Sequence, residues 1–84
     1  MFHKIKNVNA LPDFKLSVQF AEGVTKIYDV SKLFDKYSFF KHLQDNPELF
    51  SAVTVDLGGY GVIWNNDIDI FCDELFANGE LVKA

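Results

Sequence analysis

The stretch FSAVTVDLGGYGVIWNNDIDI, residues 50–70, decides how we interpret the rest of the chain. In its first part Val53, Val55 and Leu57 alternate with polar residues, and this period of two is typical of a strand with one face on a core. The glycine-rich segment 58–61 follows, where a tight reversal needs positive φ angles, and the apolar letters VIW come after it. The stretch therefore predicts a β-hairpin.

The residues on either side of the glycine-rich segment indicate how the two strands pair. A two-residue turn at the tip would pair Leu57 with Val62, and Val55 with Trp64, which makes the inner face apolar. The letters DIDI that follow the next turn alternate in the same way and predict a short edge continuation. We therefore expect the hairpin to span about residues 51–70.

A second hairpin is predicted upstream, over about residues 14–30. The letters FKLSVQF alternate cleanly, a Glu-Gly pair supplies a turn, and the β-rich letters TKIYDV return. A tight turn there would pair Phe20 with Thr25 and leave Tyr28 on the outer face of the hairpin.

Helical segments are predicted between the hairpins, at about residues 31–50, and after the second one, at about residues 72–78. Between the hairpins, apolar residues recur at spacings of one, three and four, which favours short helices. Ser31 and Ser38 are placed to cap two of these helices, and Pro47 suits the first turn of a third.

The whole chain, residues 1–84, is predicted to form one small α+β domain in which antiparallel hairpins build a sheet packed on the short helices. Apolar residues make up 49% of the composition, so a core can form without disulfides or metals. Cys72 is the only cysteine, which excludes an intrachain disulfide and indicates a reducing compartment. Since neither a signal peptide nor a membrane span is recognisable, we expect a soluble cytoplasmic protein.

The charge of the chain disfavours nucleic acid as a direct ligand. Eight basic and twelve acidic side chains give a formal net charge of −4, the wrong sign for a domain that must neutralise phosphates. All the basic side chains are lysines, so arginine, the usual reader of phosphate and guanine, is absent. We expect no direct binding of DNA or RNA.

One acidic cluster has residue types that bind metals. Asp67, Asp69, Asp73 and Glu74 could supply oxygen ligands for calcium, but such a loop requires a glycine after its third ligand, and none is present. Solvated acidic residues at the start of a helix explain the cluster, because they favour the positive end of the helix dipole. We therefore expect no metal site.

The remaining reactive side chains do not form a catalytic set. His3 and His42 have no nucleophile or second ligand at a motif spacing, and both are expected on the surface. Cys72 would gain thiolate character at a helix start, but the acidic residues that follow oppose the negative charge. We expect no catalytic residue and no cofactor, and hence no enzyme.

Aromatic residues give the strongest indication of function. In a domain this small, Tyr28, Tyr37, Tyr60, Phe39 and Phe40 cannot all point inward. An exposed aromatic patch would mark a surface for a protein partner or for a second copy of the chain. We expect Tyr28, Tyr37, Phe39 and Phe40 to form that surface.

Several motifs follow one another in a distinctive order. A leading strand begins with the letters LPDF, a return strand ends in YDV, and F-x-x-V-x-V-D precedes a glycine turn, I-x-W and DID. This order resembles that of the small bacterial family DUF2442, a domain of unknown function, over roughly residues 8–76. The positions that match the family motifs, which we expect to be structural, are Asp29, Phe50, Asp56, Trp64 and Asp69. The chain departs from the family pattern where Phe71-Cys72 replaces a serine-proline pair.

The resemblance implies an α+β fold and brings no catalytic residue with it. Family members occur alone or fused ahead of a helix-turn-helix DNA-binding domain, and stand-alone members are often encoded beside another short protein in a toxin–antitoxin-like arrangement. We expect no such DNA-binding domain within residues 1–84. The leading hypothesis is a non-enzymatic protein-binding module that acts with a protein partner or as a homo-oligomer. The alternative is a regulatory or antitoxin-like subunit that acts on transcription through a separate DNA-binding partner.

Overall fold

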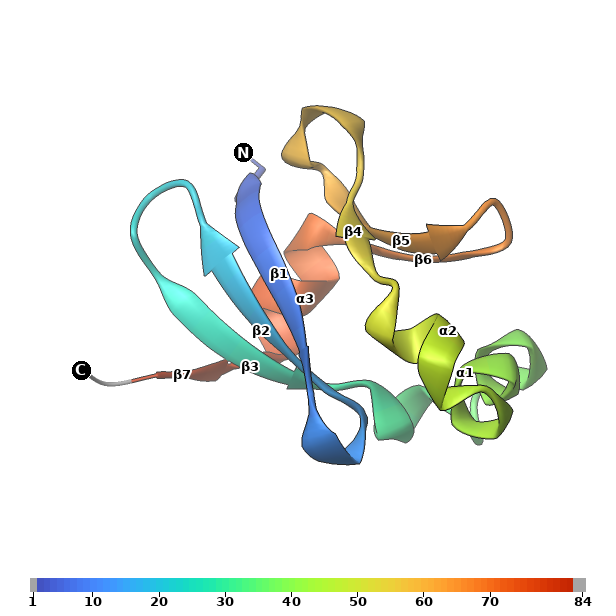
Figure 1. Ribbon diagram of the computed structural model, residues 1–84. Coiled ribbons are helices and arrows are strands. Elements are labelled where there is room, and N and C mark those ends of the chain that lie inside the picture. The colour runs from blue at the N-terminus through green and yellow to red at the C-terminus, as the bar shows by residue number, and fades with distance from the viewer. Residues whose placement is uncertain (1, 83–84) are drawn as a thin grey trace.

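Two antiparallel sheets and a set of short helices make up residues 2–82, the part of the chain that the computed structural model describes (Figure 1). The first sheet has the strand order β1-β2-β3-β7, and the second has the order β4-β5-β6. The strands are β1 (Ile5–Leu11), β2 (Lys15–Phe20), β3 (Thr25–Asp29), β4 (Thr54–Val55), β5 (Gly61–Asn65), β6 (Ile68–Phe71) and β7 (Glu80–Leu81). The α+β class is confirmed, but the two hairpins form separate sheets where a single sheet was expected. The two-residue strand β4 pairs with β5.

The helical elements are all short. The α-helices are α1 (Lys41–Asp45), α2 (Pro47–Ser51) and α3 (Cys72–Asn78), and the 3₁₀ turns are η1 (Pro12–Phe14), η2 (Val30–Leu33), η3 (Ser38–Phe40) and η4 (Leu57–Gly59). Pro47 opens α2 as predicted, and α3 has the predicted bounds. No helix within residues 2–82 is both long enough and apolar enough to cross a membrane.

The register of the first hairpin differs from the prediction by one residue. Leu16 pairs with Tyr28, and the N–H of Phe20 donates to the carbonyl of Val24 at 2.8 Å. The loop therefore has three residues and places Gly23 at a φ of 97°. Because side chains alternate along a strand, a slip of one residue moves each of them to the other face. Tyr28 accordingly lies in the core and not on the outer face.

The second hairpin differs from its predicted register by two residues, so its inner face is preserved. Val55 pairs with Val62, and Trp64 lies on the same buried face. The loop is wider than a two-residue turn because the N–H of Asp56 donates to the carbonyl of Gly61 at 2.8 Å. Leu57 is therefore part of η4 and is 93% exposed, where pairing with Val62 was expected.

The caps predicted at Ser31 and Ser38 are both wrong, and the C-terminal segment adds a strand. Asp29, and not Ser31, caps η2, because its carboxylate accepts the N–H of Ser31 at 3.0 Å. Ser38 lies inside η3, whose N-cap residue makes no side-chain hydrogen bond. Glu80–Leu81, which lie beyond the helix predicted at residues 72–78, form β7 and pair with β3.

One hydrophobic core connects the two sheets. Helix α3 packs against β3 of the first sheet and β6 of the second, and Figure 1 shows it between them. The core gathers side chains from both sheets and from the helical segment before β4. Its largest completely buried members are Phe20, Leu16, Leu43, Leu75, Val18, Val30, Val62 and Cys72.

Candidate functional site

The four aromatic residues expected on a partner surface separate into two buried and two exposed side chains. Tyr28 is 4% exposed and Phe40 is 3% exposed, so neither can belong to an exposed patch. Tyr37 is 46% exposed and Phe39 is 41% exposed. Only the second pair is available to a partner.

Tyr28 connects the first sheet to the last helix. Its hydroxyl donates to a carboxylate oxygen of Glu74 at 2.8 Å. Burial raises the pKa of the Tyr28 phenol well above its usual range, and the hydrogen bond and the negative charge of Glu74 raise it further. The side chain therefore remains neutral and fixes α3 on β3.

Phe40 and two family-motif positions are packed together in the core. The Phe40 ring meets the indole of Trp64 edge-on, with ring centres 6.3 Å apart. The indole N–H of Trp64 donates to the backbone carbonyl of Phe50 at 2.9 Å. These contacts hold η3 and α2 against β5, so the three residues support the surface above them.

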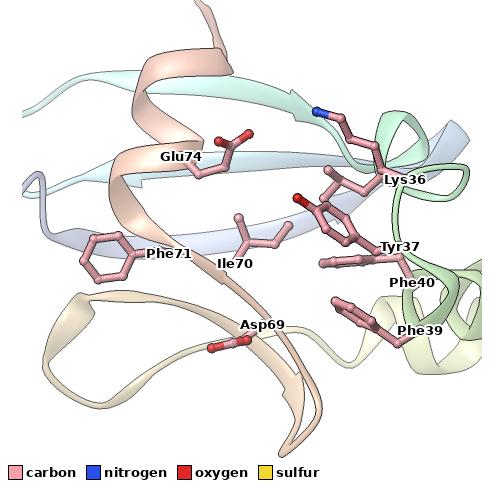
Figure 2. A pocket seen from close by; sticks show the side chains of 9 residues that line it. Lys36, Tyr37, Phe39, Phe40, Asp69, Ile70, Phe71 and Glu74 are labelled. Carbon is pink, nitrogen blue, oxygen red and sulfur yellow. The ribbon is translucent and has the colours of Figure 1, made fainter.

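The exposed pair forms one wall of a groove. The Tyr37 and Phe39 rings lie 5.6 Å apart, and both residues border a cavity of about 260 Å³. Across it lie Asp69, Ile70 and Phe71 of β6, and Figure 2 shows this strand facing the aromatic rings. The groove thus separates the helical segment from the edge of the second sheet.

A second hollow shares the Phe39 ring and follows the same strand. Its volume is about 440 Å³, and it is bordered by Ile68 of β6 and by Leu49 of α2. His42 and Asp67 supply polar groups on its two sides. The two hollows share Phe39, and between them they border all four residues of β6, so we refer to them jointly as the groove.

Phe71 belongs to an aromatic cluster that sequence reasoning did not identify as surface. It is 49% exposed, and the Phe2 ring meets it edge-on at 5.4 Å. Phe2 also contacts Tyr60 at 5.5 Å. The alternation in the letters IDIF could have predicted that Phe71 is exposed, because alternate residues of a strand share a face and Phe71 therefore lies on the same outer face as Asp69.

The other family-motif positions have simple contacts. The carboxylate of Asp29 caps η2, and that of Asp56 accepts the N–H of Leu57 at 2.7 Å at the start of η4. Asp69 makes no such cap and is exposed beside the groove. The first two carboxylates stabilise turns, and the third contributes charge to the groove.

Cys72 and His3 lie in different environments. Cys72 is fully buried, and burial, followed by the charge of Asp73, raises the pKa of its thiol. His3 contacts Glu22 at 2.7 Å and stacks on the ring of Phe76. Among residues 2–82, no three His, Cys, Asp or Glu side chains come close enough together to hold a metal ion.

A comparison with known protein families shows that the groove lies within the part of the chain that one family model matches. The model of the family described as "Protein of unknown function (DUF2442)" matches residues 5–80. The match confirms the resemblance seen in the motifs and includes both walls of the groove. Neither a curated protein nor a solved structure matches the chain.

Proposed function

Because the chain belongs to the DUF2442 family, whose function is unknown, we propose a function from its surface: a non-enzymatic module that binds a protein partner in the groove beside β6. The observation that carries the proposal is the exposure of Tyr37 and Phe39 over a cavity of about 260 Å³. Exposed aromatic side chains beside a surface hollow are typical of protein-binding surfaces.

The shape of the groove favours a peptide or a protein edge over a small molecule. The two hollows are open to solvent, and each borders a different part of the same strand. Small-ligand pockets are usually concave, and a few polar groups converge inside them. The charged residues that line this groove, such as Asp69, Asp67 and Lys36, are exposed to solvent.

The second candidate function is a regulatory role in transcription. The charge of the chain supports a form of this role in which a separate partner contacts the DNA. With a formal net charge of −4 and no arginine, the domain is poorly suited to bind DNA phosphates itself. In a regulatory complex the partner would therefore make the DNA contacts. Adding DNA to the purified chain at low salt should give no mobility shift, and a shift that weakens steeply with salt would argue against this version.

The test of the binding proposal is recovery of the tagged chain from its native cells, followed by mass-spectrometric identification of companion proteins. We expect one defined companion with the unaltered chain and its loss with Phe39→Ala or Tyr37→Ala. Leu81→Ala is the matched control, because Leu81 is 54% exposed on β7, in the other sheet. Recovery of the same companion by all variants would refute the role of the groove.

A further inference from the structure

Strand β6 forms an open edge of the second sheet. It pairs with β5 on one side, and in the order β4-β5-β6 no strand from residues 2–82 pairs with its other side. The N–H of Cys72 donates to the carbonyl of Tyr60 at 2.8 Å, so the backbone groups of residue 72, and of residue 70 two positions before it, point toward β5. The alternate residues, Asp69 and Phe71, therefore direct their backbone groups to the open side.

Three backbone groups on that side have no partner among residues 2–82. They are the N–H and carbonyl of Asp69 and the N–H of Phe71. The carbonyl of Phe71 differs, because Phe71 is the N-cap residue of α3 and its carbonyl accepts the first bond of that helix. Unpaired groups of this kind are a template for an added strand.

The groove continues from this edge and suits the side chains of such a strand. The buried faces of Ile68 and Ile70 border it from β6, and the Phe39 ring borders it from the other wall. Alternate side chains of a strand point to opposite faces. Every second residue of an added strand would thus enter the groove beside Ile70, and the others would lie on the face of Asp69.

The charge around β6 indicates which charge an added strand should carry. Asp67, Asp69 and Glu74 line the groove together with one lysine, Lys36, so acidic side chains outnumber lysines there, and β6 itself carries no basic residue. If a second copy paired with β6, the aspartates of the two copies would be brought together across the new ladder. Like charges that face each other across strands are destabilising, whereas opposite charges stabilise the pair. The edge therefore disfavours its own copy and favours a basic segment.

We propose that the partner contributes an extended segment that adds to β6 as a fourth strand of the second sheet, with lysine or arginine opposite Asp69 and apolar residues in the groove. The proposal rests on the groove being the binding surface, and it specifies the chemistry of what the groove holds. The backbone of the segment pairs with Asp69 and Phe71, and its basic side chains pair with the exposed aspartates.

A synthetic nine-residue peptide of alternating lysine and valine tests the proposal in a titration against the ¹⁵N-labelled chain. We expect saturable shifts at Asp69, Phe71 and Phe39, and slower hydrogen exchange at the amides of Asp69 and Phe71. A glutamate–valine peptide of the same length should bind about tenfold more weakly or not at all. Asp69→Lys should reverse this preference.

The backbone pairing has its own control. A peptide residue directly opposite Asp69 would form two backbone hydrogen bonds with it, one from the N–H of each residue. When a lysine takes that place, the lysine amides of the peptide face β6 and the valine amides face away. N-methylation of the lysine amides should abolish binding, and N-methylation of the valine amides should leave it within about twofold. Equal effects of the two methylation patterns, or no binding at about 1 mM peptide, would overturn strand addition.

The two proposals fail in different ways. If the companion protein is lost with Phe39→Ala but the peptide shows no dependence on methylation, the groove binds a partner by another mode, and strand addition is wrong. If the companion is retained with Phe39→Ala, the groove is not the binding surface, and the proposed function itself is wrong.

Discussion

Phe39 and Phe40 are neighbours in sequence with ring centres 4.8 Å apart, yet Phe39 is 41% exposed and Phe40 is 3% exposed. The 3₁₀ turn η3 produces this division, because successive side chains of a helical turn point in different directions. Phe40 packs on Trp64 in the core, and Phe39 stands over the groove. One short turn thus supplies both an anchor and a candidate contact residue.

This division predicts opposite results for two alanine substitutions. Phe40→Ala should lower the free energy of unfolding by about 3–5 kcal/mol, because it leaves a cavity in the core. That is a large part of the roughly 5–15 kcal/mol that stabilises a small domain. Phe39→Ala should cost less than about 1 kcal/mol. Chemical denaturation followed by circular dichroism measures both values, and a loss at Phe39 as large as at Phe40 would show that Phe39 is a core residue.

The bond between the Trp64 indole and the Phe50 carbonyl is expected to hold α2 against β5. Trp64→Phe removes the donor and leaves the buried carbonyl without a partner, which should cost about 1–3 kcal/mol in addition to lost packing. Circular dichroism is the suitable signal, because Trp64 is the only tryptophan and the variant has no indole fluorescence. An unchanged unfolding midpoint would show that the bond contributes nothing.

Alkaline pH should destabilise the fold through Tyr28. The pKa of its phenol is raised in the folded chain by burial and by Glu74, whereas in the unfolded chain a tyrosine loses its proton near pH 10. Above that pH the unfolded state binds fewer protons than the folded state, so the free energy of unfolding falls as pH rises. Below about pH 10 this contribution is fully present.

Tyr28→Phe is the control for that pH dependence. It should be less stable near neutral pH because it loses the bond to Glu74, but it should lose less additional stability between about pH 9.5 and 11. Burial also raises the pKa of the Cys72 thiol. The free energy of unfolding therefore also falls from about pH 8.5 through Cys72, equally in the unaltered chain and in Tyr28→Phe. Parallel curves for the two proteins above pH 10 would contradict the assignment.

Gly61 is expected to control how closely β6 approaches β5. A Cβ atom at this position would lie 2.6 Å from the carbonyl oxygen of Ile70, so alanine must push the strands apart. Gly61→Ala should cost about 1–3 kcal/mol and speed amide exchange at Ile70. Gly23→Ala is the comparison, since it strains the loop of the other hairpin at a φ of +97° and should leave exchange at Ile70 unchanged. Similar exchange in both variants would disprove the local effect.

Local sequence patterns predicted most of the elements but not their exact pairing. The hairpins, the proline at the start of α2 and the bounds of α3 follow from alternation and turn chemistry, which act over a few residues. The face of Tyr28 was wrong because the loop before β3 has three residues, and the difference of one residue is invisible in the alternation. The exposure of Leu57 was missed for a related reason, since the Asp56–Gly61 bond closes a wider loop.

The candidate site was only half predictable. Tyr37 and Phe39 were expected on a surface from the excess of aromatic residues, but nothing local distinguishes them from Phe40. The groove needs η3 and β6 side by side, and about 30 residues separate these elements in the chain. Contacts over such distances depend on how α3 and the two sheets pack together. The periodicity of residues within a single element does not predict how separate elements pack together.

The most direct test of the binding surface is the affinity of the purified companion protein for the chain and its variants, measured by isothermal titration calorimetry. If the groove holds the partner, Phe39→Ala should weaken binding at least about tenfold, as expected for an aromatic anchor at the centre of an interface. Leu81→Ala, on the β7 side, should change it less than about twofold. Equal affinities of the unaltered chain and Phe39→Ala, with both proteins folded, would contradict the account.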